Sequence, residues 1–268
     1  MKNFRLKNKF CLITGAGGLL GYEHAYALLE IGANIILTDI DVKKIKRSQK
    51  KLKEVFPDQE IIYNKLDITN EKSVQKCLIH YKKKNIFISV LLNNASFNPP
   101  PSKLNSTLLE NYNINRWKKE LDVGLTGAFI CSKVFGTEMA KNKNGVILNI
   151  SSDLSVISPD QRLYNKDDKK IFRAKPVTYS VAKTGLIGLT RYIATYWSKN
   201  NVRCNAISPG GVLNKHNKIF VKKLNKLIPM GRMANRSEYR ASIQFLCSDA
   251  SSYMTGQNIV IDGGRSIW

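Results

Sequence analysis

The sequence predicts an α/β protein built on a doubly wound parallel sheet, with helices on both faces in a three-layer α/β/α arrangement. Short apolar runs alternate with amphipathic helical segments along the 268 residues, and such linking helices imply parallel strands with right-handed crossovers. A glycine cluster also separates the first apolar run from the first helical segment. We expect one domain, residues 1–268, which binds its ligands outside the carboxyl ends of the strands.

The first half of the chain alternates strands with helices. A strand is expected at Lys9–Thr14, and the helical pattern at Leu19–Ile31 stops at Gly32, a residue type common just after helices. Asp41 stands where it can cap the next helix. The other elements expected here are strands at Asn34–Thr38, Ile61–Leu66 and Ile86–Leu92, and helices at Val42–Val55 and Glu71–Tyr81.

The second half continues this pattern around longer loops. We expect helices at Trp117–Ala140, Thr178–Lys199 and Arg236–Cys247, and strands at Val146–Ser151, Val202–Ile207 and Asn258–Ile261. Polar segments at Ser96–Asn115, Asp153–Pro176 and Gly211–Pro229 interrupt the rhythm, and each follows a strand. Loops of this length are often functional, so we expect them to surround one site.

The formal net charge is +23, from 43 basic and 20 acidic residues. A basic surface for nucleic acid or for a nucleotide substrate would give such an excess. The lysines are nevertheless spread along the chain, many on expected solvent faces of helices, in a composition rich in Lys, Asn and Ile. We favour composition as the explanation and expect no nucleic-acid partner.

Targeting and metal signals are weak in this sequence. No apolar run approaches the ~20 residues of a membrane span, and the apolar stretch after the basic Met1–Phe10 segment is short and ends in glycines, unlike a signal peptide. The histidines lack metal-ligand spacing, and the cysteines form no Cys-x-x-Cys pair; they are Cys11, Cys77, Cys131, Cys204 and Cys247. We expect a cytoplasmic protein that has no metal site and does not bind membranes.

The glycine cluster predicts a dinucleotide site. Its residues run from Thr14 to Gly21 between a strand and a helix, where glycines let the backbone approach a pyrophosphate and the helix N-terminus offers free N–H groups. Asp39 ends the second strand and can accept hydrogen bonds from both ribose hydroxyls of NAD, while its charge repels the 2′-phosphate of NADP. Lys43 and Lys44 are expected to point outward, so we predict NAD(H) as the cofactor.

Further motifs follow the later strands in order. They are Asp67-Ile68, Asn93-Asn94-Ala95, Ser152, Tyr179-Ser180-Val181-Ala182-Lys183, Pro209-Gly210 and Asp262-Gly263-Gly264. With these motifs the chain resembles the short-chain dehydrogenase/reductase family, single-domain type with a Rossmann fold, over essentially its whole length. The resemblance implies that cofactor is bound by Gly15, Gly17, Gly18, Leu20, Gly21, Asp39, Ile40, Asp67, Ile68, Asn94, Ala95, Tyr179, Lys183, Pro209, Gly210 and Val212.

Tyr179 and Lys183 stand four residues apart, so they share one face of a helix. A phenol has a pKa near ~10, and a nearby ammonium stabilises the phenolate and lowers that pKa. The resemblance implies that Lys183 acts in this way and holds the nicotinamide ribose, that Tyr179 exchanges a proton with the substrate, and that Ser152 hydrogen-bonds the substrate oxygen. These three residues are the expected catalytic trio.

Two positions depart from the family pattern. Gly15, Gly18 and Gly21 have the spacing of the longer epimerase and dehydratase branch, although the ending of the chain matches the short branch. Gly124 stands where the family usually has an asparagine that anchors a water in a proton relay. A helix kink at Gly124 would let a backbone carbonyl hold that water instead.

The substrate is predicted only by class. Between Ser152 and Tyr179 lie 26 residues, about twice the usual gap in the family, and this insert either grips a hydroxylated or phosphorylated substrate or is a solvated flap. The insert includes Asp160, Gln161, Arg162, Tyr164 and Lys166. The insert, the glycine spacing and the ending Asp262–Trp268 resemble a branch associated with flagellin modification and surface-sugar biosynthesis, which implies a sugar or sugar-nucleotide alcohol as substrate.

Two other functions stay open at this point. A 3-oxoacyl carrier protein reductase would suit the basic charge, although that activity usually uses NADPH and Asp39 disfavours it. A non-catalytic protein that binds NAD or nucleic acid would not need Ser152, Tyr179 and Lys183. The resemblance also implies a homotetramer or homodimer formed through the helices that start near Trp117 and Thr178.

Overall fold

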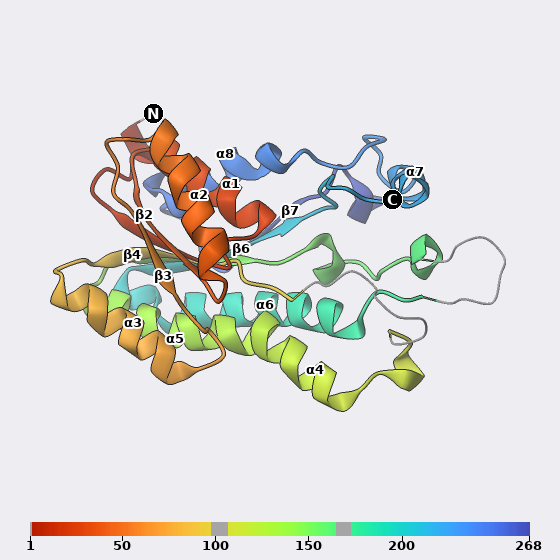
Figure 1. Ribbon diagram of the computed structural model, residues 1–268, viewed down its shortest axis with the longest axis horizontal. Coiled ribbons are helices and arrows are strands. Elements are labelled where there is room, and N and C mark those ends of the chain that lie inside the picture. Colours follow the sequence, from red (N-terminus) through yellow and green to blue (C-terminus); the bar gives the residue numbers. More distant parts are fainter. Residues whose placement is uncertain (1, 98–106, 165–172) are drawn as a thin grey trace.

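The computed structural model describes residues 2–97, 107–164 and 173–268. Its centre is a sheet of seven parallel strands in the order β3-β2-β1-β4-β5-β6-β7 (Figure 1). The order reverses between β1 and β4, which creates a crevice at the carboxyl ends of the strands. The strands are β1 (Phe10–Thr14), β2 (Asn34–Asp39), β3 (Ile61–Lys65), β4 (Ile88–Asn93), β5 (Gly145–Ile150), β6 (Val202–Pro209) and β7 (Asn258–Ile261).

Helices cover both faces of this sheet, which is the three-layer Rossmann arrangement that the sequence predicts (Figure 1). One face carries α1 (Leu19–Glu30), α2 (Val42–Val55) and α8 (Arg240–Cys247). The other carries α3 (Glu71–Lys83), α4 (Ile114–Leu121), α5 (Gly127–Lys141) and α6 (Val177–Tyr196). A further helix, α7 (Lys218–Asn225), lies beside the C-terminus. In the described residues, no helix combines the length and the apolarity that crossing a bilayer requires.

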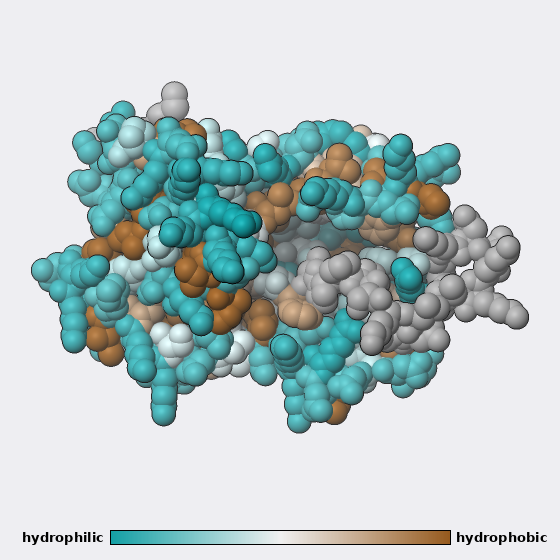
Figure 2. Space-filling view, viewed as in Figure 1, coloured by the Kyte–Doolittle hydropathy of each residue, from teal (hydrophilic) through white to brown (hydrophobic). Residues whose placement is uncertain are grey.

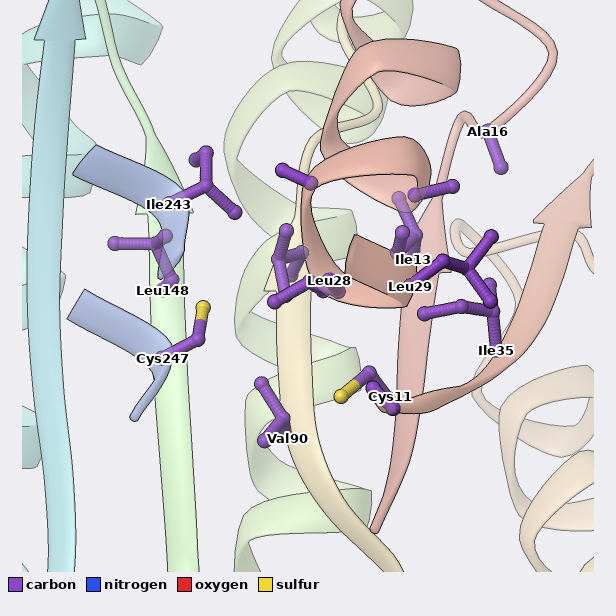
Figure 3. Close-up of a cluster of buried hydrophobic side chains, with 14 of the residues drawn as sticks. Cys11, Ile13, Ala16, Leu28, Leu29, Ile35, Val90, Leu148, Ile243 and Cys247 are labelled. Atoms are coloured by element: carbon purple, nitrogen blue, oxygen red, sulfur yellow. The ribbon is translucent and has the colours of Figure 1, made fainter. Parts of the chain in front are cut away.

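The central strands are buried on both faces because each face is covered by helices. In β1, Cys11 and Ile13 pack toward α1 and α8, while Leu12 packs toward α3 and α5, and all three side chains are fully buried. Figure 3 shows the first of these two cores, with side chains of α1 and α8 converging on β1, β4 and β5. Parallel strands covered on both faces need such continuous apolar runs. These runs distinguish the strands from the amphipathic helices in the sequence.

The predicted elements are present, with three differences in detail. The segment Gly211–Pro229, expected to be irregular, contains α7. The helix expected at Trp117–Ala140 is divided into α4 and α5 by a π-helical turn, Asp122–Thr126. The helix expected at Arg236–Cys247 begins with a 3₁₀ turn at Arg236–Tyr239 before α8. Lys166 and the prolines at 99–101 lie outside the described residues.

Candidate active site

The turn between β1 and α1 packs closely against neighbouring backbone and leaves no room for side chains at two of its glycines. Gly15 has a left-handed φ of +62°, and a Cβ there would lie 2.7 Å from the Cα of Ala95. A Cβ on Gly21 would lie 2.6 Å from the carbonyl oxygen of Gly15, so both positions exclude side chains. No side chain caps α1 at Gly18, which leaves the N–H groups of the first turn and the helix dipole to meet an anion.

Asp39 at the end of β2 organises this turn. Its Oδ2 accepts a hydrogen bond from the N–H of Gly17 at 3.0 Å, and its Oδ1 accepts one from the N–H of Asp41 at 2.9 Å. A carboxylate has about four acceptor sites, so ribose hydroxyls can still donate to it. Lys44 lies nearer to Asp39 than the sequence suggests. It lines the cleft beside Asp39, and its Nζ lies 3.6 Å from Oδ2 of Asp41. The expectation that Lys44 points away is therefore wrong, because its position in the first turn of α2 faces the glycine turn.

Asn94 fixes the glycine turn to the end of β4. Its Nδ2 donates to the carbonyl oxygens of Thr14 at 2.8 Å and Gly15 at 3.0 Å, and its N–H donates to the Thr14 hydroxyl at 3.0 Å. These bonds hold the first and fourth strands at the separation where the crevice opens. Asn94 therefore shapes the site through the backbone of Gly15.

A cleft of about 1050 Å³ runs along this edge of the sheet. Figure 2 shows the surface hollowed between the body of the sheet and the α7 region. The cleft brings together most of the residues that the sequence assigns to the cofactor, and its lining includes Gly15, Gly18, Leu20, Gly21, Asp39, Ile40, Asp67, Ile68, Asn94, Ala95, Tyr179 and Lys183.

Four of the expected cofactor residues do not line this cleft. Gly17 does not line the cleft, and its N–H donates a hydrogen bond to Asp39. Pro209 ends β6, and Gly210 lines a separate cavity of about 80 Å³ next to Asp262. Val212 forms a bridge to Ala234. Gly210 and Val212 therefore lie outside the cleft that the glycine turn lines.

The expected catalytic trio converges where β5 ends against α6. Lys183 is buried and its Nζ donates to the carbonyl oxygen of Ile150 at 2.6 Å, while the same Nζ lies 5.8 Å from the centre of the Tyr179 ring. Ser152 follows β5 and its hydroxyl hydrogen-bonds Tyr179. The Ser152 Oγ also donates to Oδ1 of Asp153 at 2.8 Å. The three side chains therefore form one connected group.

Burial controls the titration of this group. It raises the pKa of the Tyr179 phenol, and the hydrogen bond between Tyr179 and Ser152 partly offsets that rise. Burial, together with the smaller effect of the charge of Lys175, lowers the pKa of Lys183 to about 8. Both shifts favour the neutral forms, so additional charge or hydrogen bonding from bound ligands is needed to stabilise a phenolate.

Gly124 occupies the π-helical turn between α4 and α5. A Cβ at this position would lie 3.0 Å from the Cβ of Ala182 on α6. Next to it lies a cavity of about 10 Å³, lined by Glu120, Gly124, Tyr179 and Lys183 among others, which has room for about one water. π-turns mark places where a helix deviates from regular geometry, so the helix departs from regularity at the position where the sequence suggests a kink.

Charged residues to which the sequence analysis gave no role surround the trio. Arg265 Nη1 donates to Oδ2 of Asp153 at 2.6 Å, and these side chains are only 8% and 5% exposed. The ammonium of Lys175 lies 3.9 Å from the centre of the Tyr179 ring. Sequence spacing could not show this group, because the ion pair joins residues 112 positions apart. Arg162 from the insert pairs instead with Asp160 at 2.7 Å and is largely exposed.

The fold and the cleft define a class of protein: a Rossmann-type oxidoreductase that binds a nicotinamide dinucleotide. A family model described as enoyl-(acyl carrier protein) reductase matches residues 15–266. The chain belongs to the short-chain dehydrogenase/reductase family, as its motifs suggest.

Similar proteins of known name cover nearly the whole chain. An NAD-dependent glycerol dehydrogenase of Listeria innocua is 31% identical over 273 residues, covering 99% of this chain and 97% of the relative. A 3-oxoacyl-[acyl-carrier-protein] reductase of Thermotoga maritima is 31% identical over 98% of this chain and 100% of the relative. The solved structure of an NAD⁺-bound xylitol dehydrogenase has a TM-score of 0.84 at 26% identity, covering 96% of this chain and 99% of that chain.

Proposed function

We propose that the protein is an NAD(H)-dependent oxidoreductase that interconverts a secondary alcohol and a ketone on a sugar or sugar nucleotide. One observation carries the proposal: the glycine turn with Asp39 and the pair Tyr179 and Lys183 line one continuous cleft of about 1050 Å³. A dinucleotide bound at the glycine turn would reach along the cleft to Tyr179 and Lys183. A protein that only stores or senses NAD has no need of these acid–base residues.

The residues fit a nicotinamide dinucleotide. The side-chain-free turn and the uncapped N-terminus of α1 would hold the pyrophosphate, Asp39 the adenosine ribose, and Lys183 the nicotinamide ribose. The cofactor supplies the hydride chemistry when it is bound. Asp39 supports NAD over NADP, while Lys44, which lines the cleft beside Asp39, would favour a 2′-phosphate.

The chemical work of the chain is proton exchange at the substrate oxygen. Tyr179 donates its phenolic proton to a ketone oxygen, or accepts one from an alcohol. Ser152 hydrogen-bonds the same oxygen and stabilises its developing charge. The positive charge of Lys183 favours the phenolate that forms as Tyr179 gives up its proton.

Polyhydroxylated substrates are supported by the relatives, since two of the named proteins act on glycerol or xylitol. The test is a fluorescence titration with NADH and NADPH, followed by a screen of sugar and sugar-nucleotide alcohols with NAD⁺. We expect NADH to bind at least tenfold more tightly than NADPH and at least one sugar derivative to be oxidised. If NADPH binds more tightly, the proposed cofactor is wrong.

A carrier-protein reductase is the second candidate. It is favoured by the 31% identity to the Thermotoga reductase and by the net charge of +23, which would attract an acidic carrier protein. Reduction of an acetoacetyl thioester with NADPH, without oxidation of any sugar derivative, would establish it in place of the sugar oxidoreductase.

We also propose a cytoplasmic protein that works as a homodimer or homotetramer. All five cysteines are buried and free, as is usual in a reducing compartment. The helices α4, α5 and α6 expose large apolar side chains, among them Ile114, Phe129, Tyr192 and Tyr196, which a second copy of the chain can cover. Light scattering of the purified protein tests this: a monomeric mass would exclude the oligomer.

A further inference from the structure

The hydroxyl of Ser152 has more possible acceptors than it has protons to donate. A serine hydroxyl carries one proton and two lone pairs. Ser152 Oγ donates to Oδ1 of Asp153 at 2.8 Å and accepts from the N–H of Leu154 at 3.2 Å. It also hydrogen-bonds Tyr179, and this bond can offset the burial-raised pKa of the phenol only when Ser152 is the donor. While its proton lies on Asp153, Ser152 has none to give to Tyr179 or to a substrate oxygen.

Asp153 competes strongly for this proton because it accepts as a buried carboxylate. Its side chain is only 5% exposed. Besides the Ser152 hydroxyl it accepts the N–H of Leu154 at 2.9 Å and Nη1 of Arg265 at 2.6 Å, and such a set of donors suits the ionised form. A hydrogen bond to an ionised acceptor is roughly twice as strong as a neutral one. The hydroxyl of Ser152 is consequently held toward Asp153.

Arg265 limits how strongly Asp153 holds that proton. Its guanidinium is 8% exposed and bonds the second carboxylate oxygen, Oδ2, so its positive charge acts where salt screens little. A buried carboxylate without such a partner would be unfavourable and would place its full charge on the Ser152 hydroxyl. Burial raises the pKa of Tyr179 most, and the charge of Asp153 raises it further. Arg265 therefore acts on Tyr179 through Asp153 and Ser152.

We propose that Asp153 and Arg265 are positioning residues that control when the Ser152 proton is available to the reacting oxygen. The inference rests on the proposed function, in which Ser152 hydrogen-bonds the substrate oxygen. As negative charge develops on that oxygen or on Tyr179, the Ser152 hydroxyl turns from Asp153 toward it. No covalent bond changes in this step, and Arg265 stabilises the carboxylate that loses its hydrogen bond.

The titration of Tyr179 tests the proposal without turnover. Protein saturated with NAD⁺, whose positive nicotinamide lowers the pKa of a nearby phenol, is titrated with base while tyrosinate absorbance is recorded. The same titration of a matching variant that also carries Y179F subtracts the other tyrosines. D153N leaves one acceptor oxygen, which Arg265 engages, so the Ser152 proton becomes free for the phenolate. We expect D153N to lower the pKa of Tyr179, and R265M, which exposes the full charge of Asp153, to raise it.

The S152A background separates the hydroxyl from the direct charge of Asp153. In S152A and S152A/D153N the charge changes in the same way, but no Ser152 proton is present. Because hydrogen bonds to charged groups are among the stronger ones, the D153N shift should be larger by about one pKa unit when Ser152 is present. Lys175 and Lys183, two cations that face the Tyr179 ring, are the same in every variant. Equal D153N shifts with and without Ser152 overturn the proposal.

Control variants exclude a general effect of charge or of folding. D160N removes the carboxylate that pairs with Arg162 in the insert and should leave the titration of Tyr179 unchanged. Circular dichroism shows whether each variant is folded. If R265M is unfolded, D153N, which keeps the size of the side chain and removes its charge, decides alone.

The proposed function fails separately from this inference. If wild type does not bind NAD⁺, the oxidoreductase proposal is wrong, and the D153N comparison is made on the protein alone by NMR of tyrosine labelled at the ring carbon that bears the oxygen. The chemical shift of this carbon changes when Ser152 donates to the phenol instead of accepting from it. If NAD⁺ binds and sugars are oxidised, but the D153N shifts are equal with and without Ser152, only the positioning role is wrong.

Discussion

Replacing Asp39 by Asn tests the nucleotide end of the cleft with little change in side-chain size. The carboxylate accepts hydrogen bonds from the N–H groups of both Gly17 and Asp41. An amide has only one oxygen, so asparagine would turn its NH₂ toward one of these two donors. The ribose hydroxyls would then lose a charged acceptor. Hydrogen bonds to charged groups contribute about 1.5–3 kcal/mol, so we expect NADH to bind about 10- to 150-fold more weakly.

NADPH should respond in the opposite direction. Removing one negative charge ~5 Å from a phosphate relieves at least about 0.8 kcal/mol of repulsion per phosphate charge in a water-like medium, or about fourfold in affinity. Lys44 would strengthen this gain once the neighbouring carboxylate is neutral, because it lines the same cleft. The ratio of NADH to NADPH affinity should therefore fall at least about 40-fold.

The assay is NADH and NADPH fluorescence titration of wild type and D39N, and the matched control is D41N. That variant loses the same charge two residues away, where Asp41 caps α2 through the N–H groups of Lys43 and Lys44, and asparagine caps a helix equally well. We expect D41N to bind both nucleotides within twofold of wild type. D39N binding NADH within twofold of wild type would refute the role given to Asp39.

Three further perturbations follow from the geometry. Y179F should lower kcat/KM by at least about 10²-fold, the contribution of a general acid, without weakening NADH binding. G136A should lower the free energy of unfolding by about 1–3 kcal/mol, because the new Cβ would lie 2.3 Å from the Trp197 ring; urea unfolding measures it. Folding lowers the pKa of Lys175 to about 8, so the charged lysine destabilises the folded protein at pH 7, and this cost disappears as the pH rises toward ~10.4. K175M without ligand should therefore be up to about 3 kcal/mol more stable than wild type at pH 7 and lose that advantage by pH ~10.4.

Each of these predictions has its own control and contrary result. Y192F changes an exposed tyrosine on the same helix and should keep full activity; a tenth or more of the activity surviving in Y179F would contradict its role. G188A places its Cβ with nothing within 4 Å and should gain up to about 1 kcal/mol, so equal effects of G136A and G188A would contradict the packing argument. A K175M advantage that is the same at both pH values would mean that Lys175 is not destabilised by its charge.

The sheet and the glycine turn could be predicted because their signals are local. A strand buried on both faces must be continuously apolar, and the turn at Gly15 needs both a left-handed φ and the absence of a Cβ, so each leaves a mark within a few residues. Tyr179 and Lys183 are likewise set by one helical turn. Their place at the end of the cleft follows from the strand order alone.

Features that depend on distant contacts could not be predicted. The helix α7 is eight residues long, too short to be stable alone, and it forms because Leu224 packs against Leu163 from the insert. The charged group around Tyr179 arises from three chain segments with no fixed spacing. Lys44 was misplaced for a similar reason, since helical periodicity gives its face on α2 but not the direction of α2 relative to the glycine turn.

The ion pair between Asp153 and Arg265 has a consequence for how the protein is made and handled. Arg265 lies three residues before Trp268, whose Nε1 donates to the carbonyl oxygen of Leu227 at 3.0 Å, so the C-terminal residues are built into the substrate side of the enzyme. Asp153, the neighbour of Ser152, therefore depends for its charge partner on a residue 112 positions later in the chain. A purification tag joined to Trp268 would be attached three residues after Arg265, the partner of Asp153, whereas the turn Lys2–Phe4 lies far from α7 and the C-terminus (Figure 1).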